Sequence, residues 1–479
     1  MPLNRDDRKG MTRMDAVEET LVFYGLMNLS TIDPLGNFEG GEIVFDAFHE
    51  SCERKAEAGA LGQDSLDDDK RYPVALFAIS RREAWRILQV TVQQFNSQSW
   101  WKIILRASTN DGVAVRFLLS DDNVQLNNVY RVISITPADP PVNESLDALT
   151  QLPTAPLFEG ANIGRAFRIA GSQSIRVNVV DVGQGNLNAI QSGSDTHLFF
   201  DLGWPTTFQD RAGLPRFKPD LSSGSERTAP VVLSHWDWDH WGMAIDTVVF
   251  HRGGGSTITW HIPALERPWI VPGIGSDWGG VKLRPLHWRF VRELNRRGQL
   301  YLWPASRSEM EFDHVSIYRT REISRGRRAN DPNQNGLAMV VHEWRPSDTA
   351  QLKGILLPGD ADFINIPILH GSRVPYKFNG LVATHHGAAF TYEGCPSTFS
   401  DFARVAVSVG YKNGYRHPRK MALATYVARG WTHQARTDYR LDMDPLYDEY
   451  LANVTLTLNG IASGAAIYAF ASSSLYWWR

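Results

Sequence analysis

The chain reads Ser234-His235-Trp236-Asp237-Trp238-Asp239-His240-Trp241-Gly242 directly after the short apolar run at 231–233. Four side chains that can bind a metal therefore fall within six residues, at the end of what the apolar pattern predicts to be a buried strand. Two carboxylates beside two imidazoles are costly to bury unless a cation neutralises them. Histidine and aspartate are also common ligands of divalent metals. The stretch therefore predicts a divalent-metal site.

The composition is typical of a folded globular protein with more than one domain. The 479 residues are 43% hydrophobic and 21% charged, and the formal net charge is −3. A chain of this length usually forms at least two domains. The small net charge argues against a protein that coats nucleic acid, so a site for a polyanion would have to be a local patch. Cys52 and Cys395 lie far apart in the sequence, which favours a reducing compartment, the cytoplasm, over a disulfide-linked secreted protein.

The two ends of the chain predict neither a targeting segment nor a membrane span. Residues 1–15 mix charges and lack the apolar core of a secretory signal. The apolar tail at 460–478 is interrupted by glycine and serine, and it follows an alternating stretch and the turn pair Asn459-Gly460. A terminal β-hairpin is the better interpretation, so we expect no membrane contact.

A proline-rich stretch divides the chain into two parts. Five prolines within twenty residues predict a linker over residues 137–165. Residues 1–136 then form a small α+β domain, in which Ser80 and Glu83 have the spacing of a helix capping box. This part carries no catalytic pattern, and we expect an accessory role such as binding a protein partner. Residues 166–479 form the larger domain, which carries the candidate site.

Five predicted strands of the larger domain end in histidine or aspartate. Each is a short apolar run that ends in polar or glycine residues, as is typical of buried strands. Strand ends at one edge of a sheet can converge on a single site, so we expect these side chains to lie together. In chain order they are Asp201, then His235, Asp237, Asp239 and His240, then Asp360, then His385 and His386, and finally His417.

These segments resemble the metallo-β-lactamase superfamily, whose usual signature is His-x-His-x-Asp-His. Asp237 stands where that signature has its second histidine, a variant that resembles the ComEC-type domains of bacterial DNA uptake. Further segments resembling motifs of these domains, in the same order, lie at 180–185, 356–361, 385–387 and 407–418. The resemblance covers about residues 172–440. It implies an α/β fold, the αβ/βα four-layer sandwich of that superfamily, with the smaller N-terminal α+β domain before it.

The resemblance also implies a set of metal ligands. His235 and Asp237 would hold one ion, Asp239 and His240 a second, and Asp360 would bridge the two. Three histidines compete for the remaining positions, and of these we favour His385 and His417. The separate third-motif histidine of the superfamily cannot be placed among the five histidines between positions 240 and 360. The expected ligands are therefore His235, Asp237, Asp239, His240, Asp360, His385 and His417.

The chemistry expected of such a site is hydrolysis by a metal-bound hydroxide. Three carboxylates offset most of the charge of two divalent ions, and exchanging an imidazole for a carboxylate shifts the preference from zinc toward manganese, so we expect two ions of zinc or manganese. The catalytic candidates are Asp239 together with His386 or His417, either of which could protonate the leaving oxygen. Asp201 would lie behind the site and orient a ligand.

The resemblance implies phosphodiester hydrolysis, so we expect a nuclease or phosphodiesterase with nucleic acid, DNA foremost, as substrate. Arg416, Arg419 and Lys420 adjoin His417 and are candidates for contact with phosphate. An arginine-rich segment at 319–328 could also contact phosphate or could be an exposed, solvated loop. Two alternatives stay open: a hydrolase of small molecules such as a cyclic nucleotide, lactone or thioester, and a non-catalytic binding protein with a degenerate metal site.

Overall fold

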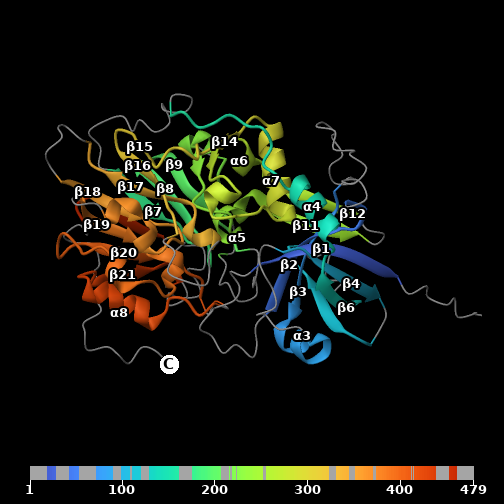
Figure 1. Cartoon of the computed structure of the whole chain (residues 1–479). Helices are drawn as coiled ribbons and strands as arrows, with labels where there is room; N and C mark the ends of the chain where they lie inside the picture. Colours follow the sequence, from blue (N-terminus) through green and yellow to red (C-terminus); the bar gives the residue numbers. More distant parts are fainter. Residues whose placement is uncertain are drawn as a thin grey trace, which may run out of the picture.

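The protein folds into a closed β-barrel beside two large β-sheets (Figure 1). The computed structural model describes residues 19–28, 42–52, 72–89, 99–107, 110–119, 129–160, 175–205, 215, 218–222, 224–251, 255–322, 331–344, 351–370, 374–411, 413, 415–438 and 453–460. Within these residues, strands outnumber helices, and most of the helices are short.

The barrel is built from the first six strands, with β1 closing onto β4. Around the barrel the strands are β1 (Thr20–Asn28), β2 (Glu42–His49), β3 (Val74–Ser80), β5 (Val113–Phe117), β6 (Tyr130–Pro137) and β4 (Trp101–Ala107). Buried and partly exposed residues alternate along β4 and β5, as expected of strands with one face toward a core. Helix α3 (Arg81–Leu88) follows β3, and its first turn is capped by the Ser80 side chain, which accepts a hydrogen bond from the Glu83 amide.

Two seven-stranded sheets form the larger part of the molecule. The first has the order β14 (Leu300–Leu302), β13 (Trp269–Val271), β10 (Val231–Val232), β9 (Asp195–Leu202), β8 (Leu187–Ser192), β7 (Ile175–Val179) and β22 (Val454–Thr457). The second has the order β15 (Glu309–Glu311), β16 (Val315–Arg319), β17 (Leu337–His342), β18 (Leu352–Leu357), β19 (Tyr376–Val382), β20 (Arg404–Val407) and β21 (His433–Arg436). Their facing side chains share one buried apolar cluster, so the sheets pack face to face.

The two sheets share one order of strand pairing. In the first, β22, β7, β8 and β9 pair antiparallel, and β9, β10, β13 and β14 pair parallel. In the second, β15 to β18 pair antiparallel, and β18 to β21 pair parallel. The fourth and fifth strands of each sheet, counted from its antiparallel edge, are β9 and β10 in one and β18 and β19 in the other. His235, Asp237, Asp239 and His240 follow β10, the other candidate ligands follow β18, β19 and β20, and Asp201 lies at the end of β9.

The described helices and turns are short and lie in the connections between strands. Besides α3, the described α-helices are α4 (Pro140–Leu149), α5 (Trp238–Trp241), α6 (Ile262–Leu265), α7 (Pro285–Arg296) and α8 (Lys420–Ala428). The 3-10 turns are η4 (Gly224–Thr228), η5 (Gly242–Ala244), η6 (Ser276–Trp278), η7 (Pro332–Gln334), η8 (Phe363–Asn365), η9 (Pro367–Leu369), η10 (Thr384–Gly387) and η11 (Tyr392–Gly394). Helix α4 falls within the stretch that the prolines suggested as a linker.

The expected four-layer αβ/βα sandwich is wrong for this chain. The structure is rich in strands, with two mixed sheets packed directly on one another and a separate closed barrel. Among the described residues, the outer face of the second sheet packs on 3-10 turns, loops and helix α8, without a continuous layer of helices. In its described residues, the N-terminal part is a closed barrel with the short helix α3, where an α+β domain was expected. Short apolar runs identify strands well, but they do not reveal what covers the outer faces of a sheet.

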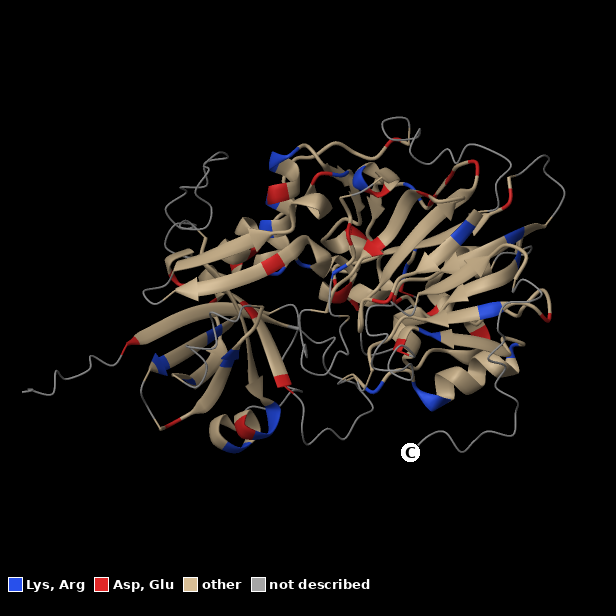
Figure 2. Ribbon diagram, turned by 180° about the vertical axis from the view of Figure 1, so that it is seen from behind, with Lys and Arg blue, Asp and Glu red and all other residues tan. Residues whose placement is uncertain are grey.

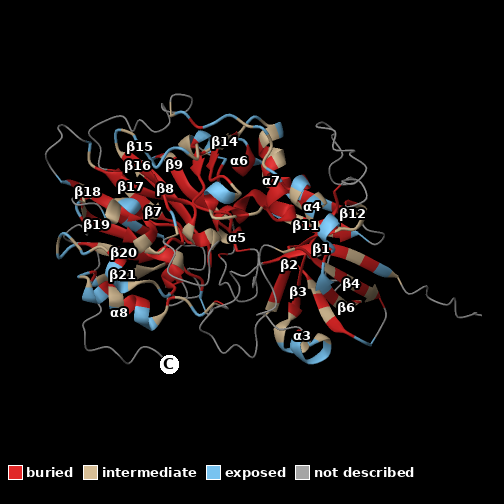
Figure 3. Ribbon diagram, viewed as in Figure 1, coloured by how far each residue is buried: buried red, intermediate tan, exposed pale blue. Residues whose placement is uncertain are grey.

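The barrel packs on the first sheet through α7 and the hairpin of β11 (Ile245–His251) and β12 (Gly255–Trp260), which lie between them (Figure 1). Phe250 of β11 belongs to the barrel's own core, where its ring stacks on Phe117 at 5.7 Å between centroids. Trp288 of α7 packs edge-on against Phe48 and Tyr72 of the barrel side. Most of the barrel and sheet strands are buried, whereas α3 and α8 each present an exposed face (Figure 3).

The described helices also bear on the expectation about membranes. Among the residues that the structure describes, no helix combines the length and apolar character that crossing a bilayer requires.

Asp46 of β2 gives this interface a measurable dependence on pH. Its carboxylate is fully buried and accepts hydrogen bonds from the Leu286 amide at the start of α7, at 3.1 and 3.2 Å. Burial raises the pKa of Asp46 to about 8, against the opposing effects of that amide and the charge of Arg284. The folded state keeps this proton up to about pH 8, whereas the unfolded state releases it near pH 4. As the pH rises from about 4 to 8, the free energy of unfolding should therefore fall by up to ~1.4 kcal/mol per pH unit.

Urea denaturation of Asp46→Asn and wild type at pH 5 and pH 8 tests this dependence. The asparagine variant should gain relative stability at pH 8, since it has no proton to lose. The exposed Asp313→Asn variant should keep a constant difference from wild type. An Asp46→Asn difference that is equally constant would contradict the assignment.

Candidate metal centre

The candidate site lies where loops from both sheets meet. From the first sheet, β9 ends near Asp201, and β10 leads into the turn and short helix α5 that carry His235 to Trp241. From the second, the turn after β18 carries Asp360, and η10 after β19 carries His385 and His386. Asp360 is therefore far from His235 in sequence, yet its Oδ2 lies 3.7 Å from the Nε2 of that histidine.

Two groups of ligand-type atoms lie close enough together to hold metal ions. In the first, His235, His240 and Asp360 each point one atom into a space less than 4.8 Å across. Asp360 Oδ1 lies 3.1 Å from His240 Nε2. The carboxylate of Asp237 adjoins this group, with Oδ2 3.6 Å from His235 Nε2. Donors about 2.1 Å from a tetrahedral ion lie roughly 3.4 Å from one another, so these separations suit ligands of one ion.

The second group consists of Asp239, His240 and His386. His386 Nε2 lies 3.0 Å from Asp239 Oδ2, and His240 Nε2 lies 3.9 Å from Asp239 Oδ1. His240 belongs to both groups. The structure therefore places His386 with Asp239 and His240, where the sequence had favoured His385 and His417 as ligands.

The histidines are oriented by the atoms behind them. His240 donates from Nδ1 to Asp201 Oδ2 at 2.8 Å, and His386 donates from Nδ1 to the carbonyl oxygen of Ser408 at 2.8 Å. The Ser234 hydroxyl donates to Asp201 and lies 3.0 Å from His235 Nδ1. Each ring therefore presents Nε2 to the site, the arrangement that metal-binding histidines adopt. Asp201 lies behind the ligands, as the sequence suggested.

The Nε2 atoms of these three histidines have no hydrogen-bond partner among the described residues, although they are buried. The same holds for Asp360 Oδ1. A buried polar atom without a partner is costly, and four that converge on one space require a shared partner. A divalent cation satisfies imidazole nitrogens and carboxylate oxygens together, so the residues present fit a metal site.

The protonation of the site reflects its excess of carboxylates. Burial alone would lower the pKa of His240, but the charges of Asp360 and Asp201 outweigh it and hold that pKa well above the ordinary value. Burial would likewise lower the pKa of His386, and contact with Asp239 raises it instead. Without metal, protons on these imidazoles balance the carboxylates, and a cation would take over that task.

Strained backbone positions gather around the site. Of the six non-glycine residues with positive φ in the described part of the chain, four lie here: Asp201, His385, His386 and Arg416. The two histidines have φ of 47° and 55°, a conformation that disfavours ordinary side chains. Such strain is retained where the fold must aim particular side chains.

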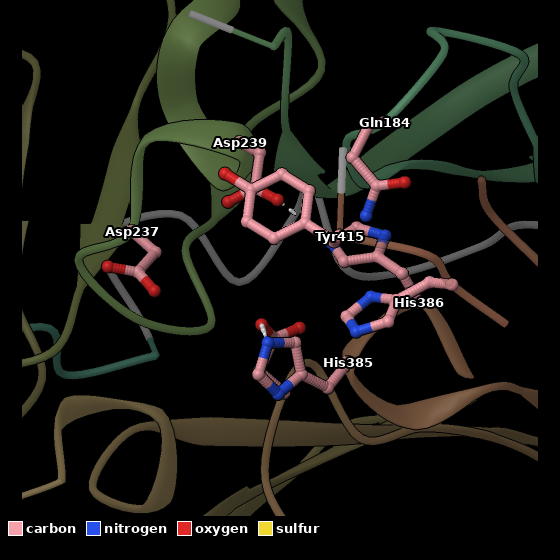
Figure 4. Close-up of a pocket in the computed structure, with 8 residues that line it drawn as sticks. Gln184, Asp237, Asp239, His385, His386 and Tyr415 are labelled. Carbon is pink, nitrogen blue, oxygen red and sulfur yellow. Dashed lines mark ion pairs between the residues drawn. The ribbon is translucent and has the colours of Figure 1, made fainter. Parts of the chain in front are cut away.

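The groups open into a small pocket (Figure 4). Asp237, Asp239, His385 and His386 point toward a common space, which Tyr415 also lines. The remaining lining residues are Gln184, Asp360 and His417. The space between these residues, including the part that is open to solvent, is about 220 Å³. So small an open space suits one chemical group of a molecule that lies mostly outside.

Comparison with known proteins gives no family for this chain. No family model matches the sequence, and no curated protein matches it either. We therefore infer the function of this protein from the geometry of its site.

His385 and His417 lie at the pocket without joining the two groups. His385 Nε2 is 3.5 Å from Asp360 Oδ2, and its side chain is 29% exposed. The His417 ring is half-buried, with its centroid 5.5 Å from that of His385. Burial, together with the charges of His385 and His386, lowers the pKa of His417 well below the ordinary value, so the ring is neutral near pH 7.

The basic residues Arg416, Arg419 and Lys420 flank the pocket residue His417 in the chain. The Arg419 amide donates to the Gly387 carbonyl at 2.8 Å, which fixes this segment beside the His385–His386 turn. Arg416 and Lys420 are exposed, and Arg419 is partly exposed. The start of α8 is visible as a blue end of that helix in Figure 2.

The arginine-rich segment is only partly described. Arg319 is buried, with its guanidinium 4.1 Å from the centre of the Trp278 ring, so it packs inside the protein and is not available to phosphate. Arg321 is exposed, and residues 323–330 lie outside the described residues. The tryptophans of the metal loop, Trp236, Trp238 and Trp241, are core residues, as the sequence favoured.

One residue that faces the site was missed by the sequence analysis. Arg284, immediately before α7, points Nη1 at Asp237 Oδ1 over 3.5 Å. Burial would raise the pKa of Asp237, but His235 and the charge of Arg284 hold it well below its usual range. No local motif surrounds Arg284, and only the fold brings it to the site. The two groups contain none of the five histidines between positions 240 and 360.

Proposed function

We propose that this protein is a metal-dependent hydrolase that cleaves phosphodiester bonds, with DNA as its substrate. The observation that carries the proposal is the convergence of the buried Nε2 atoms of His235, His240 and His386, which make no hydrogen bond of ordinary geometry with the described residues, on the carboxylates of Asp239 and Asp360. The pocket and its surroundings hold more carboxylates than fixed cations, so a bare phosphate would be repelled. Divalent cations must therefore bind before a phosphodiester can approach.

Two divalent ions, zinc or manganese, match this donor set. His240, Asp239 and His386 would hold one, His235 and Asp237 the other, and Asp360, whose two oxygens face His240 and His235, would contribute to both. When bound, the ions would supply an activated water and neutralise charge on the phosphate.

The residues around the ligands suit a polyanion that reaches in with one phosphate. The small pocket admits a single group, and Arg416, Arg419 and Lys420, which flank the pocket residue His417 in the chain, would hold the neighbouring phosphates. Tyr415 lines the pocket with an aromatic ring, on which a base or sugar could stack.

Of the two histidines considered for the leaving oxygen, His417 is the better placed. His386 has Nδ1 occupied by Ser408 and Nε2 directed at Asp239. His417 lines the pocket, and its Nδ1 has no hydrogen-bond partner among the described residues. A neutral ring at this position can donate one hydrogen bond to a substrate oxygen.

The proposal also covers where the protein is located in the cell and which part of it would bind a partner protein. We propose a cytoplasmic enzyme, where the buried thiols of Cys52 and Cys395 would stay reduced. A protein partner would bind through the N-terminal barrel.

Cleavage assays with defined metals test the proposed function. Chelator-treated protein is loaded with Mn²⁺ or Zn²⁺. It is then incubated with labelled single- and double-stranded DNA and, separately, with a small phosphodiester. We expect metal-dependent DNA cleavage that falls steeply with salt and is absent from Asp239→Ala. The exposed Asp313→Ala variant should retain it. Bound metal without DNA cleavage would reject the nuclease, and salt-insensitive hydrolysis of small esters alone would favour a small-molecule hydrolase.

A further inference from the structure

Arg284 places a fixed positive charge beside one half of the candidate metal centre. Its side chain is 9% exposed, and Nη1 lies 3.5 Å from Asp237 Oδ1. The other oxygen of Asp237 faces His235 Nε2 at 3.6 Å. One carboxylate therefore lies between a guanidinium on one side and a candidate metal ligand on the other.

Arg284 is held in this position by the helix that it precedes. The Leu286 amide, two residues further on, donates to the buried carboxylate of Asp46 on the barrel. Later in α7, Arg289 Nη1 donates to the Tyr72 carbonyl at 2.8 Å. Because the barrel fixes both the first turn and the middle of α7, Arg284 differs from a surface arginine that can turn away into solvent.

The other group of ligands has no such neighbour. Asp239 faces His386 and His240, and Asp239 has no ion pair with a described lysine or arginine. An ion bound there would interact with the full charge of its carboxylate. An ion bound at His235 and Asp237 would share the Asp237 carboxylate with a guanidinium that already offsets its charge, and would be repelled by that guanidinium.

We infer that Arg284 makes the two halves of the metal centre unequal, so that the Asp239–His240–His386 group binds its ion tightly and the His235–Asp237 half binds a second ion weakly. The inference rests on the metal site of the proposed function and deepens it. The inference also assigns the N-terminal barrel a structural role, because the barrel holds helix α7, which positions this arginine. The second ion would then bind best together with an anionic substrate.

Calorimetric titration of the chelator-treated full chain with Mn²⁺ tests the inference without any measurement of catalysis. Wild type should bind one ion tightly and a second at least tenfold more weakly. Arg284→Gln should tighten the second ion at least tenfold and leave the first unchanged, whereas Arg284→Lys should resemble wild type. Arg292→Gln is the matched control, because Arg292 lies on the same helix over the ring of Trp288. It should leave both affinities unchanged.

A second variant keeps the inference testable if Arg284→Gln does not fold. Asp237→Asn should weaken only the second, weaker ion, and loss of the tight ion in that variant would overturn the inference. Two ions of equal affinity in wild type, or an unchanged second affinity in folded Arg284→Gln, would overturn the inference alone. Absence of any Mn²⁺ or Zn²⁺ binding by wild type would overturn the proposed function together with it.

Discussion

Replacement of Asp360 by alanine is expected to abolish metal binding and hydrolysis. Both oxygens of this carboxylate face candidate ligands: Oδ1 lies 3.1 Å from His240 Nε2, and Oδ2 lies 3.7 Å from His235 Nε2 and 3.5 Å from His385 Nε2. Its loss therefore weakens both halves of the centre at once. Since loss of a residue that only orients a ligand already costs about 10–100-fold in affinity, loss of this ligand should cost more than about 100-fold.

The measurement is the metal content of the purified variant after dialysis, together with DNA cleavage at saturating Mn²⁺. Asp313→Ala, an exposed carboxylate of the same sheet, should bind metal as wild type does. Circular dichroism should show a folded chain in both variants. Wild-type metal content in a folded Asp360→Ala variant would be incompatible with the proposed centre.

Replacement of Gly203 by alanine should displace the metal loop although residue 203 binds no metal. An added Cβ would lie 1.9 Å from the carbonyl oxygen of Asp239 and 2.6 Å from the backbone N and O of Asn186. These are backbone atoms, and the Asn186 amide donates to that same Asp239 carbonyl at 2.8 Å. Neither neighbour can rotate away as a side chain would. We expect a loss of ~1–3 kcal/mol or more in the free energy of unfolding and at least a tenfold loss of metal affinity.

Gly255→Ala provides the matched control for this substitution. Its new Cβ would meet only the side chain of His251, at 3.9 Å, which is an ordinary contact. In urea denaturation of the metal-free proteins and in Mn²⁺ titration, the stability and metal affinity of Gly255→Ala should therefore be close to those of wild type. A Gly203→Ala protein with wild-type stability and affinity would show that the loop has room to spare.

The strands of the larger domain could be predicted from the sequence because their apolar runs are short and end in polar or glycine residues. Runs at 337–341, 355–357 and 405–409 correspond to β17, β18 and β20, and the stretch before Asn459 is β22, which pairs with β7. Strand partners were not predictable in the same way. Pairing joins β22 to β7 across most of the domain, and no local pattern encodes such a contact.

The N-terminal part shows where local patterns fail. The capping pair at Ser80 and Glu83 did mark the start of α3. Helix α3 ends at Leu88, because Gln89 after it takes the left-handed conformation, and Trp85 is 62% exposed. The barrel closes by pairing of β1 with β4, and the sequence pattern did not predict that these two strands would pair.

The site could be predicted as a set of residues but not as an arrangement. The spacing of the motifs identified the histidines and aspartates as candidate ligands, because these side chains commonly bind metal ions. The choice among His385, His386 and His417 depends on which ring nitrogen is held from behind, and the Ser408 carbonyl that holds His386 has no sequence signature. Arg284 is likewise one arginine among many until the fold sets it opposite Asp237.

The shared pairing order of the two sheets has a consequence for how the molecule responds to chelation. Each sheet contributes ligands from equivalent strands. A bound ion would therefore link the two sheets at the edge where their ligand-bearing loops meet, which we call the seam. Its binding energy would resist their separation, by about 4 kcal/mol when free metal exceeds its dissociation constant a thousandfold. Hydrogen exchange on removal of metal should therefore quicken first at the amides of β10 and β18 that border the seam, while the barrel's amides stay as protected as before.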